Sequence, residues 1–265
     1  MNGQNKILSL DDAVNLIKDN TFLALGGFTL YRRPTKFILQ FLKKNTAKNL
    51  NVLTFTAGIE TDLLVGFERV NTIRTCYAGL EIFGFAPMFK KFAEQKKIRI
   101  IEETEASICF GLRASLADVD FMPGKGWFNT DMLKLRPEVQ VVKSPYSEKH
   151  YVAYPRIDPE ICVLHAQNVD KDGNAQLIGN LAIDRELALA SKTTIVTAEN
   201  IVETDKLIPD KVSIPGCAVK YIVHVPNGAK PTSCYPFYNV NGEWLLRYIE
   251  SCYYDKMKEY ISSVW

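Results

Sequence analysis

Residues 21–44 read TFLALGGFTLYRRPTKFILQFLKK, and this stretch decides the fold of the chain. The apolar run FLAL predicts a strand, and the apolar residues that recur at helical spacing after Pro34 predict an amphipathic helix. Gly26 and Gly27 separate the two elements with a turn. A strand, a glycine turn and a helix start form the repeating unit of α/β proteins, so the stretch predicts a parallel sheet covered by helices.

The same glycine turn is a candidate anion site. Glycine lets the backbone approach a ligand closely, and the amides at the start of the next helix carry a partial positive charge. The spacing matches neither G-x-G-x-x-G nor the G-x-x-x-x-G-K-[ST] phosphate loop. Arg32 and Arg33 follow the turn and could hold a phosphate or carboxylate in a bidentate manner. Equally, the turn could be a plain connection with two solvated arginines, and the residues alone leave both interpretations open.

The rest of the first half continues the alternation of strands and helices. The runs NVLTFT, TIRTCYAG and IRIIEE predict strands, and helical patterns lie between and after them at TDLLVGF, APMFKKFAEQKK and EASICFGLRASLA. The second half is richer in strands, with extended runs such as VQVVKSPY and HYVAYP, and VDKDGNAQ is typical of a tight turn between two strands. We expect one α/β domain over residues 1–265, with an open, mostly parallel sheet flanked by helices and a C-terminal helix packed against it.

Composition excludes several classes of protein. A net charge of +2 provides no basic surface for nucleic acid. No apolar run is long enough to cross a bilayer and the N-terminus lacks a signal peptide, so we expect a soluble, cytoplasmic protein without a membrane partner. The cysteines are scattered and form no C-x-x-C pair, which favours reduced, buried thiols over disulfides or a metal site. They are Cys76, Cys109, Cys162, Cys217, Cys234 and Cys252.

Carboxylates follow several predicted strands of the first half. Glu60, Glu81 and Glu105 each stand where a parallel strand would end, which is the edge where open α/β sheets bind their ligands. Glu105 also suits the first turn of a helix, where a negative charge is stabilising. His165, at the end of an apolar run, is best interpreted as a half-buried histidine with satisfied hydrogen bonds. No G-x-S-x-G elbow is present, which argues against a serine hydrolase.

The order of motifs resembles a known family. LALGGFTLYRRP, LLVGFERVNTIRTCYAGLE, FMPGKG, the block from KSPYSEKHYVAYP to HAQNVDKDGNAQLIG, and IPGCAVKYIVHVPNGAKPTSCY follow one another from residue 23 to about residue 240. In this order they resemble the A-type (alpha) subunit of family I CoA-transferases, most of all the glutaconate CoA-transferase type. The blocks containing HAQ, DGN and GAKPTS, at these separations, make chance agreement improbable.

The resemblance implies an enzyme that moves CoA between carboxylic acids through a glutamyl-CoA thioester. In two-chain members of the family the nucleophilic glutamate lies in the B-type (beta) subunit. The nearest match here is Glu199 in TAENIVE, but Ile201 stands where the motif needs glycine. The chain is therefore expected to lack its own nucleophile and to form a complex, A2B2 or larger, with a B-type subunit. Coenzyme A would be a substrate, and no permanently bound cofactor is expected.

The resemblance also suggests the site residues. Gly26, Gly27, Phe28 and Thr29 would line the thioester site, with their backbone donors stabilising developing negative charge. Arg32 would contact an anion, whereas Arg33 falls at a variable basic position, and Glu81 would lie in the same region.

One departure leaves the reaction open. Glu105 stands where glutaconate-type and acetoacetate-type transferases carry glutamine. A glutamate here resembles a sister group of the same fold that hydrolyses carbon–carbon bonds in cyclic CoA thioesters. An alternative to transfer is therefore a hydrolase or lyase subunit with Glu105 as general base, its pKa tuned toward neutrality by burial. A third alternative is a non-catalytic, CoA-binding partner chain.

Overall fold

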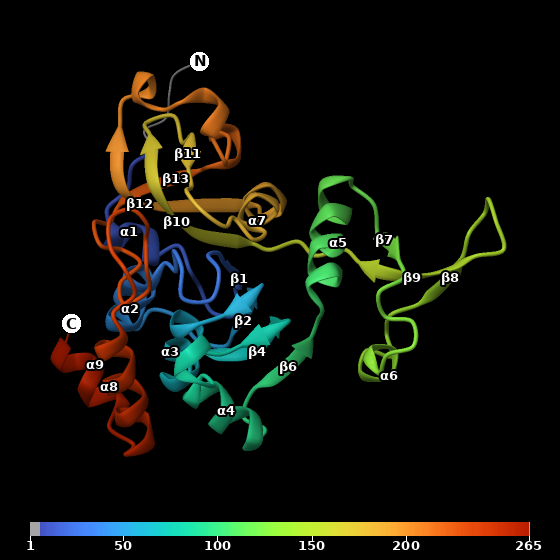
Figure 1. Ribbon diagram of the computed structural model, residues 1–265, viewed down its shortest axis with the longest axis horizontal. Coiled ribbons are helices and arrows are strands. Elements are labelled where there is room, and N and C mark those ends of the chain that lie inside the picture. Colours follow the sequence, from blue (N-terminus) through green and yellow to red (C-terminus); the bar gives the residue numbers. More distant parts are fainter. Residues whose placement is uncertain (1–5, 265) are drawn as a thin grey trace.

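A computed structural model describes residues 6–264 (Figure 1). Its centre is an eight-stranded sheet with the strand order β13-β12-β10-β1-β2-β4-β6, in which β11 pairs with β10 at the side of this path. All neighbours along the path are parallel, and only β11 is antiparallel. The strands are β1 Phe22–Leu25, β2 Leu50–Thr54, β4 Val70–Thr75, β6 Arg99–Glu102, β10 Ile161–Asp170, β11 Ala175–Gln176, β12 Thr193–Val202 and β13 Tyr221–His224.

The strand order reverses at β1. From β1 the chain builds outward through β2, β4 and β6, and it later returns to pair β10 with the other edge of β1, followed by β12 and β13. In the register of the sheet, Ala24 lies between Leu53 of β2 and Cys162 of β10. Ligands of open α/β sheets bind beyond the carboxyl ends of the strands at such a reversal, and here the glycine turn follows β1 at that point.

Successive side chains along the strands point alternately into two separate hydrophobic cores. Leu23 and Leu25 point into one hydrophobic cluster, while Ala24 between them points into the other. The first cluster is covered by a layer of helices in which neighbours touch: α1 Leu10–Val14, α2 Thr35–Lys44, α3 Ile59–Gly66, α4 Pro87–Glu94, α8 Gly242–Tyr253 and α9 Met257–Val264. The second is covered by α5 Glu105–Leu116 and α7 Asp184–Ala190. The predicted α/β sheet with helices on both faces is confirmed.

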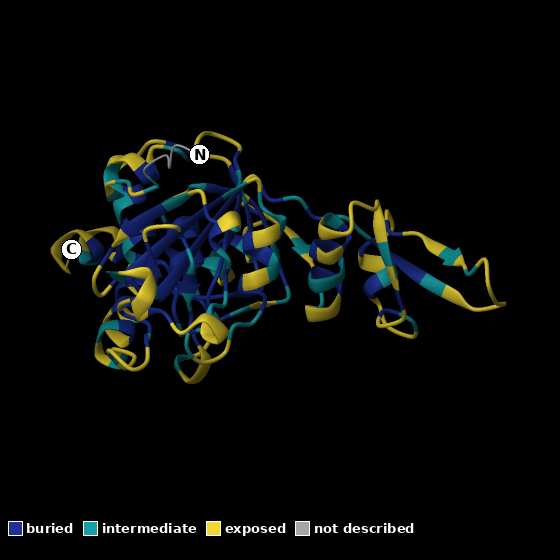
Figure 2. Cartoon of the chain, turned by 90° about the horizontal axis from the view of Figure 1, so that it is seen from above, coloured by how far each residue is buried: buried dark blue, intermediate teal, exposed yellow. Residues whose placement is uncertain are grey.

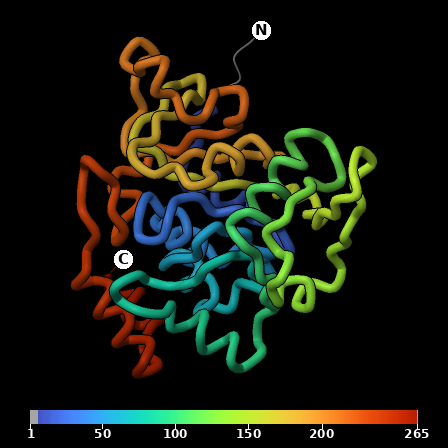
Figure 3. Tube along the Cα trace, turned by 45° about the vertical axis from the view of Figure 1, so that its right-hand side comes forward, coloured from blue at the N-terminus to red at the C-terminus, as the bar shows by residue number. Residues whose placement is uncertain are grey.

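The C-terminal helices complete the first layer, as expected. Leu245 and Tyr248 of α8 are fully buried in the cluster under that layer, and the Tyr248 hydroxyl donates to Asp62 at 2.7 Å. In Figure 3 the red C-terminal segment lies beside the chain of the first hundred residues. Among residues 6–264, the structure contains no helix with the length and apolarity needed to cross a membrane. All six cysteines are free, but only Cys162, Cys234 and Cys252 are buried as expected; Cys76 and Cys109 are half-buried, and Cys217 is exposed.

Residues 117–156 form an arm that projects from the central sheet (Figures 1 and 2). Two extended runs expected in the strand-rich second half belong to it and not to the main sheet. Strand β9 His150–Pro155 pairs antiparallel with β7 Phe121–Gly124 and with β8 Val141–Lys143, next to the short helix α6 Met132–Leu135. The arm has its own small core, in which the edge of the Trp127 ring meets Tyr154.

Two short strands form a separate sheet. Beyond β2 and β4, β3 Thr56–Ala57 pairs in parallel with β5 Tyr77–Ala78. The single turns of 3-10 helix are Glu81–Phe83, Thr204–Lys206, Pro209–Lys211 and Gly216–Ala218.

Candidate active site

The loops that follow neighbouring parallel strands meet at the reversal of strand order. The glycine turn comes directly after β1, and Gly58 comes after β3. These two loops are in direct contact, because a Cβ added to Gly58 would lie 2.6 Å from the carbonyl oxygen of Thr29. The candidate site is therefore built around the glycine turn, which has the close backbone approach that glycine permits.

Asp184, at the start of α7, holds one side of the turn. Its Oδ1 accepts the Gly27 amide hydrogen at 2.8 Å, and its Oδ2 accepts from the Arg32 guanidinium, also at 2.8 Å. The second Arg32 amino group donates to the Asn180 carbonyl at 2.5 Å. Arg32 and Asp184 are buried, with 0% and 1% of their side chains exposed, so the charge of Arg32 is neutralised inside the chain.

Arg33 holds the other side of the turn. Its guanidinium donates to the carbonyl oxygens of Gly26 at 2.8 Å and Thr29 at 3.0 Å, and it lies 3.4 Å from the Glu60 carboxylate. Burial lowers the pKa of Arg33, and the negative charge of Glu60 opposes that shift. Neither arginine is solvated: both are fully buried, and each pairs with a buried carboxylate.

The amides of the turn are already used within the chain, which corrects one expectation. Gly26 donates to Val163, Gly27 to Asp184, Phe28 to Tyr31 and Thr29 to the Thr56 hydroxyl. The expectation that these four donors are free to bind an anion is wrong. The Arg32 guanidinium binds the buried carboxylate of Asp184 within the chain. The amide of Leu30, the residue after Thr29, has no acceptor among the described residues.

Thr29 adopts a backbone conformation that its side chain disfavours. Its φ is +46°, in the left-handed region where a β-branched residue is a genuine outlier. The bonds from its amide to Thr56 and from Arg33 to its carbonyl hold it there. Thr29 is half-buried, and its hydroxyl makes no hydrogen bond to the described residues. Backbone strain of this kind clusters at functional sites.

Glu105 and Glu81 lie at the same edge of the sheet, without hydrogen bonds to the glycine turn. Glu105 is the exposed first residue of α5, whose start is capped by the Thr104 side chain. Its charge is one reason, after burial, why the pKa of the Cys76 thiol is raised to about 12. Glu81 is exposed in the 3-10 turn after β5 with a φ of +55°.

The Glu199 carboxylate accepts hydrogen bonds from four donors. It accepts hydrogen bonds from Nε2 of His165 at 2.8 Å, from the Tyr238 hydroxyl, and from the amides of Asn227 at 2.7 Å and Gly228 at 3.1 Å. Burial alone would raise the pKa of Glu199, but the bonds from His165 and Tyr238 outweigh it and lower the pKa to about 2. This carboxylate anchors residues 226–238 over the turn, because Ser233 in that segment bonds to Leu30 and Arg32.

His165 is fully buried with both ring nitrogens satisfied. Nδ1 lies 2.9 Å from the Thr197 hydroxyl, and burial lowers the pKa of the ring. Nε2 donates to the Glu199 carboxylate, and the Thr197 hydroxyl beside Nδ1 itself donates to the Leu164 carbonyl at 2.9 Å. Donor atoms of His165, Glu199 and Cys234 lie within 4.8 Å of one another. The histidine and glutamate atoms are already occupied by hydrogen bonds within the chain, so this cluster is an internal anchor.

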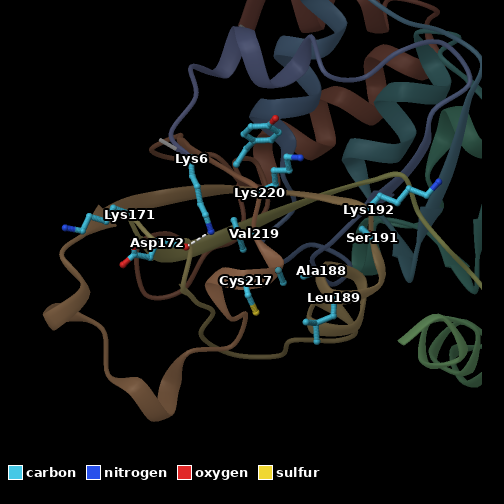
Figure 4. A pocket seen from close by; sticks show the side chains of 12 residues that line it. Lys6, Lys171, Asp172, Ala188, Leu189, Ser191, Lys192, Cys217, Val219 and Lys220 are labelled. Atoms are coloured by element: carbon cyan, nitrogen blue, oxygen red, sulfur yellow. Dashed lines mark hydrogen bonds between the residues drawn. The ribbon is translucent and has the colours of Figure 1, made fainter. Parts of the chain in front are cut away.

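A hollow of about 600 Å³ opens away from this site, beside the beginnings of β12 and β13 (Figure 4). It contains several lysines, but their charges do not converge. Lys171 and Lys192 extend outward in opposite directions, and the Lys6 ammonium is bound to the carbonyls of Asp172 and Gly216 at 2.7 Å. The glycine turn contributes nothing to the lining of this hollow.

Two signals could have identified the partners of the turn in advance. Two acidic residues directly follow short apolar runs, Asp184 after LAI and Glu60 after AGI, where a buried charge needs a partner. Two adjacent arginines after the glycine pair offer such partners. Nothing in the local pattern indicates which acid pairs with which arginine.

Comparison with known proteins supports the resemblance seen in the motifs. The model of the Coenzyme A transferase family matches residues 7–225. The chain is 28% identical over 264 residues to the A-type subunit of glutaconate CoA-transferase from Acidaminococcus fermentans, covering 92% of this chain and 82% of that protein. It is 30% identical over 250 residues to an uncharacterised protein of Archaeoglobus fulgidus, covering 92% of this chain but only 56% of the length of that relative.

The fold agrees as well. The crystal structure of glutaconate coenzyme A-transferase from Acidaminococcus fermentans superimposes with a TM-score of 0.88 at 25% identity, covering 98% of this chain and 87% of that one. The match extends over the central sheet, both helical layers and the arm, because almost the whole chain is covered. The chain therefore belongs to the coenzyme A transferase family.

Proposed function

We propose that this chain is the A-type subunit of a cytoplasmic, heteromeric CoA-transferase that exchanges CoA between an acyl-CoA and a small mono- or dicarboxylic acid. The observation that carries the proposal is the glycine turn at the reversal of strand order. Buried charges hold it from both sides, and it ends in the strained Thr29. Membership of the family and similarity to the A-type subunit of a glutaconate CoA-transferase support this reaction.

We propose that the turn stabilises negative charge through one amide and one hydroxyl. The carbonyl oxygen of Thr29 is held by Arg33, and the Thr29–Leu30 peptide is trans. In a trans peptide the N–H points away from the carbonyl, so the Leu30 amide points away from Arg33. Together with the free Thr29 hydroxyl it would offer two donors to a thioester oxygen. One such donor is typically worth about 3 kcal/mol in the transition state.

The other residues of the turn have supporting roles in this proposal. Gly26 and Gly27 allow close approach, Phe28 lines the site with its half-buried ring, and Glu81 stands at its exposed margin. Arg32 contributes by holding the turn through Asp184.

The nucleophile would come from the B-type subunit. Its glutamate would attack the acyl-CoA carbonyl carbon, forming a mixed anhydride as the CoA thiolate leaves. The thiolate would then attack the glutamyl carbonyl, giving an enzyme–CoA thioester and releasing the first acid, and the acceptor acid would reverse both steps. Within this chain, Glu199 is unsuited to that role because its oxygens are bound by four donors. Glu60 is unsuited because it is buried against Arg33.

The test is to purify this chain alone and co-expressed with a B-type subunit from the same genome. Each preparation is assayed with acetyl-CoA and a panel of mono- and dicarboxylic acids, with new CoA thioesters read by mass spectrometry. We expect transfer by the pair only, and a CoA adduct on the glutamate of the partner after trapping. Native mass spectrometry should give A2B2 or a larger complex. Transfer by this chain alone, or an adduct on it, would contradict the proposal.

A further inference from the structure

We infer that Asp184 is a positioning residue of the proposed active site: it is the anion that Arg32 binds, and it orients the peptides of the glycine turn. The inference rests on the proposed function, which gives the glycine turn its catalytic role. Asp184 lies 157 residues further along the chain than Gly27, at the start of a helix on the second core. It therefore ties the catalytic turn to a distant element of the fold.

Among the described residues, the hydrogen bonds of the Asp184 carboxylate go to the glycine turn and to Arg32, which follows it. One carboxylate oxygen accepts the Gly27 amide and the other accepts Arg32, both at 2.8 Å, and the side chain is buried. The approach is so close that a Cβ added to Gly26 would lie 2.6 Å from Oδ1 of Asp184. Cδ2 of Leu164 would lie closer still, at 2.0 Å, so the Leu164 side chain and the carboxylate together leave room only for glycine at this position.

Asp184 and Arg33 bind opposite ends of the Gly26–Gly27 peptide. Arg33 attracts carbonyl oxygens of the turn, and Asp184 attracts one of its amides. Each therefore fixes one end of that peptide dipole. Arg33 also holds the Thr29 carbonyl, whose peptide carries the Leu30 amide, a donor without an acceptor among the described residues. Loss of Asp184 would free the Gly27 amide and leave Arg32 buried without its counter-ion, so the turn would shift. Catalytic geometry tolerates little displacement, and a shift of about 1 Å can cost about a hundredfold in rate.

The test uses the co-expressed complex and the variant Asp184→Asn, which keeps an acceptor for Gly27 but removes the charge that holds Arg32. Hydrogen exchange is followed in peptides covering residues 22–33 and, as an internal reference, in α8. Steady-state kinetics are measured with the donor and acceptor pair that the wild-type complex uses. Glu186→Gln on the same helix is the matched control, because Glu186 pairs with Arg113 near the surface.

We expect exchange in residues 22–33 to become about tenfold faster while α8 is unchanged. We also expect kcat to fall by about tenfold to a hundredfold with KM within about threefold, which is the signature of a lost transition-state interaction. Glu186→Gln should match wild type in both measurements. If Asp184→Asn does not fold, the neutral double variant R32Q/D184N removes both buried charges together and serves in its place.

Two results would overturn the inference. One is exchange in residues 22–33 that stays at the wild-type rate; the other is a uniform rise in exchange with kcat falling only as the folded fraction falls. The exchange measurement does not depend on the reaction. If the wild-type complex transfers no CoA, the proposed function fails, yet the exchange rates still decide whether Asp184 fixes the turn.

Discussion

The carboxylate of Glu199 lies 2.8 Å from Nε2 of His165, and both side chains are buried. Glu199 stands near the end of β12 and His165 in the middle of β10, so the contact links neighbouring strands across the sheet. The same carboxylate binds the amides of Asn227 and Gly228, which begin the segment that closes over the glycine turn. A glutamate that resembles the nucleophile motif in sequence thus serves as an anchor.

This anchor predicts a stability that falls at low pH. Its bonds lower the pKa of Glu199 from the ordinary value of 4.5 to about 2. The stabilisation is therefore fully present above pH 4.5 and is lost as the pH falls toward 2. Glu199→Gln should be less stable at pH 7 and should lose less of its free energy of unfolding across that acid window. Urea denaturation of both proteins across this range measures the effect, and equal losses in the two proteins would rule it out.

Alanine substitutions at Gly27 and at Gly84 distinguish the destabilisation caused by steric contact from the destabilisation caused by backbone strain. Both glycines have positive φ, +87° and +96°, so alanine is strained at either position. At Gly27 the new Cβ would also lie 2.7 Å from backbone oxygens of Tyr31 and Arg32, whereas nothing lies within 4 Å at Gly84. We expect Gly27→Ala to cost about 1–3 kcal/mol more than Gly84→Ala in free energy of unfolding, as for overpacking. If chemical denaturation shows equal losses in free energy of unfolding for the two variants, the turn shifts to accommodate the new Cβ without cost.

Substitutions of Thr29 test its hydroxyl as a donor. Thr29→Ala should lower kcat of the complex by about tenfold to a thousandfold, in the range for removal of one donor. Thr29→Ser keeps the hydroxyl and should retain most of the rate. Thr29→Gly relieves the strain at φ +46° but adds backbone entropy to the unfolded chain, so its free energy of unfolding should change by less than about 1 kcal/mol. If alanine and serine behave alike, the hydroxyl has no role.

Arg32→Ala should act on stability more than on substrate binding. The substitution leaves Asp184 buried without its counter-ion, which we expect to lower the free energy of unfolding by about 3–5 kcal/mol. Arg247→Ala breaks an exposed pair with Glu243 and should change it by less than about 0.5 kcal/mol. The opposite pattern for Arg32→Ala, a raised KM for acyl-CoA with unchanged stability, would show that Arg32 contacts the ligand.

Glu105→Gln distinguishes transfer from hydrolysis. A transferase of the proposed kind needs no base at this position, so the exposed Glu105 should be replaceable with CoA transfer mostly intact. A general base would lose about a hundredfold or more in rate. The assay follows both CoA transfer and free CoA release by the wild-type and variant complexes. Release that depends on Glu105 would favour the hydrolase or lyase alternative.

Much of the fold follows from local patterns. The alternating strands and helices of the first half predict a parallel sheet, and the apolar faces of the helices predict which surfaces it buries. The extended runs at residues 141–143 and 150–155 were also recognisable as strands. The sequence does not show that these two strands belong to a separate antiparallel sheet, because the choice of partner strand depends on contacts between residues far apart in the chain.

The sequence by itself determined the strand, glycine turn and helix around Gly26 and Gly27, the family, and the absence of a recognisable nucleophile motif. Each is a property of neighbouring residues or of motif order. Only the tertiary structure decided what the turn can bind. Pairing of β1 with β10 brings Asp184 to Gly27 and Arg32, and it commits amides that the turn alone would leave free. Hydrogen-bond partners 157 residues apart are set by packing, which local periodicity does not encode.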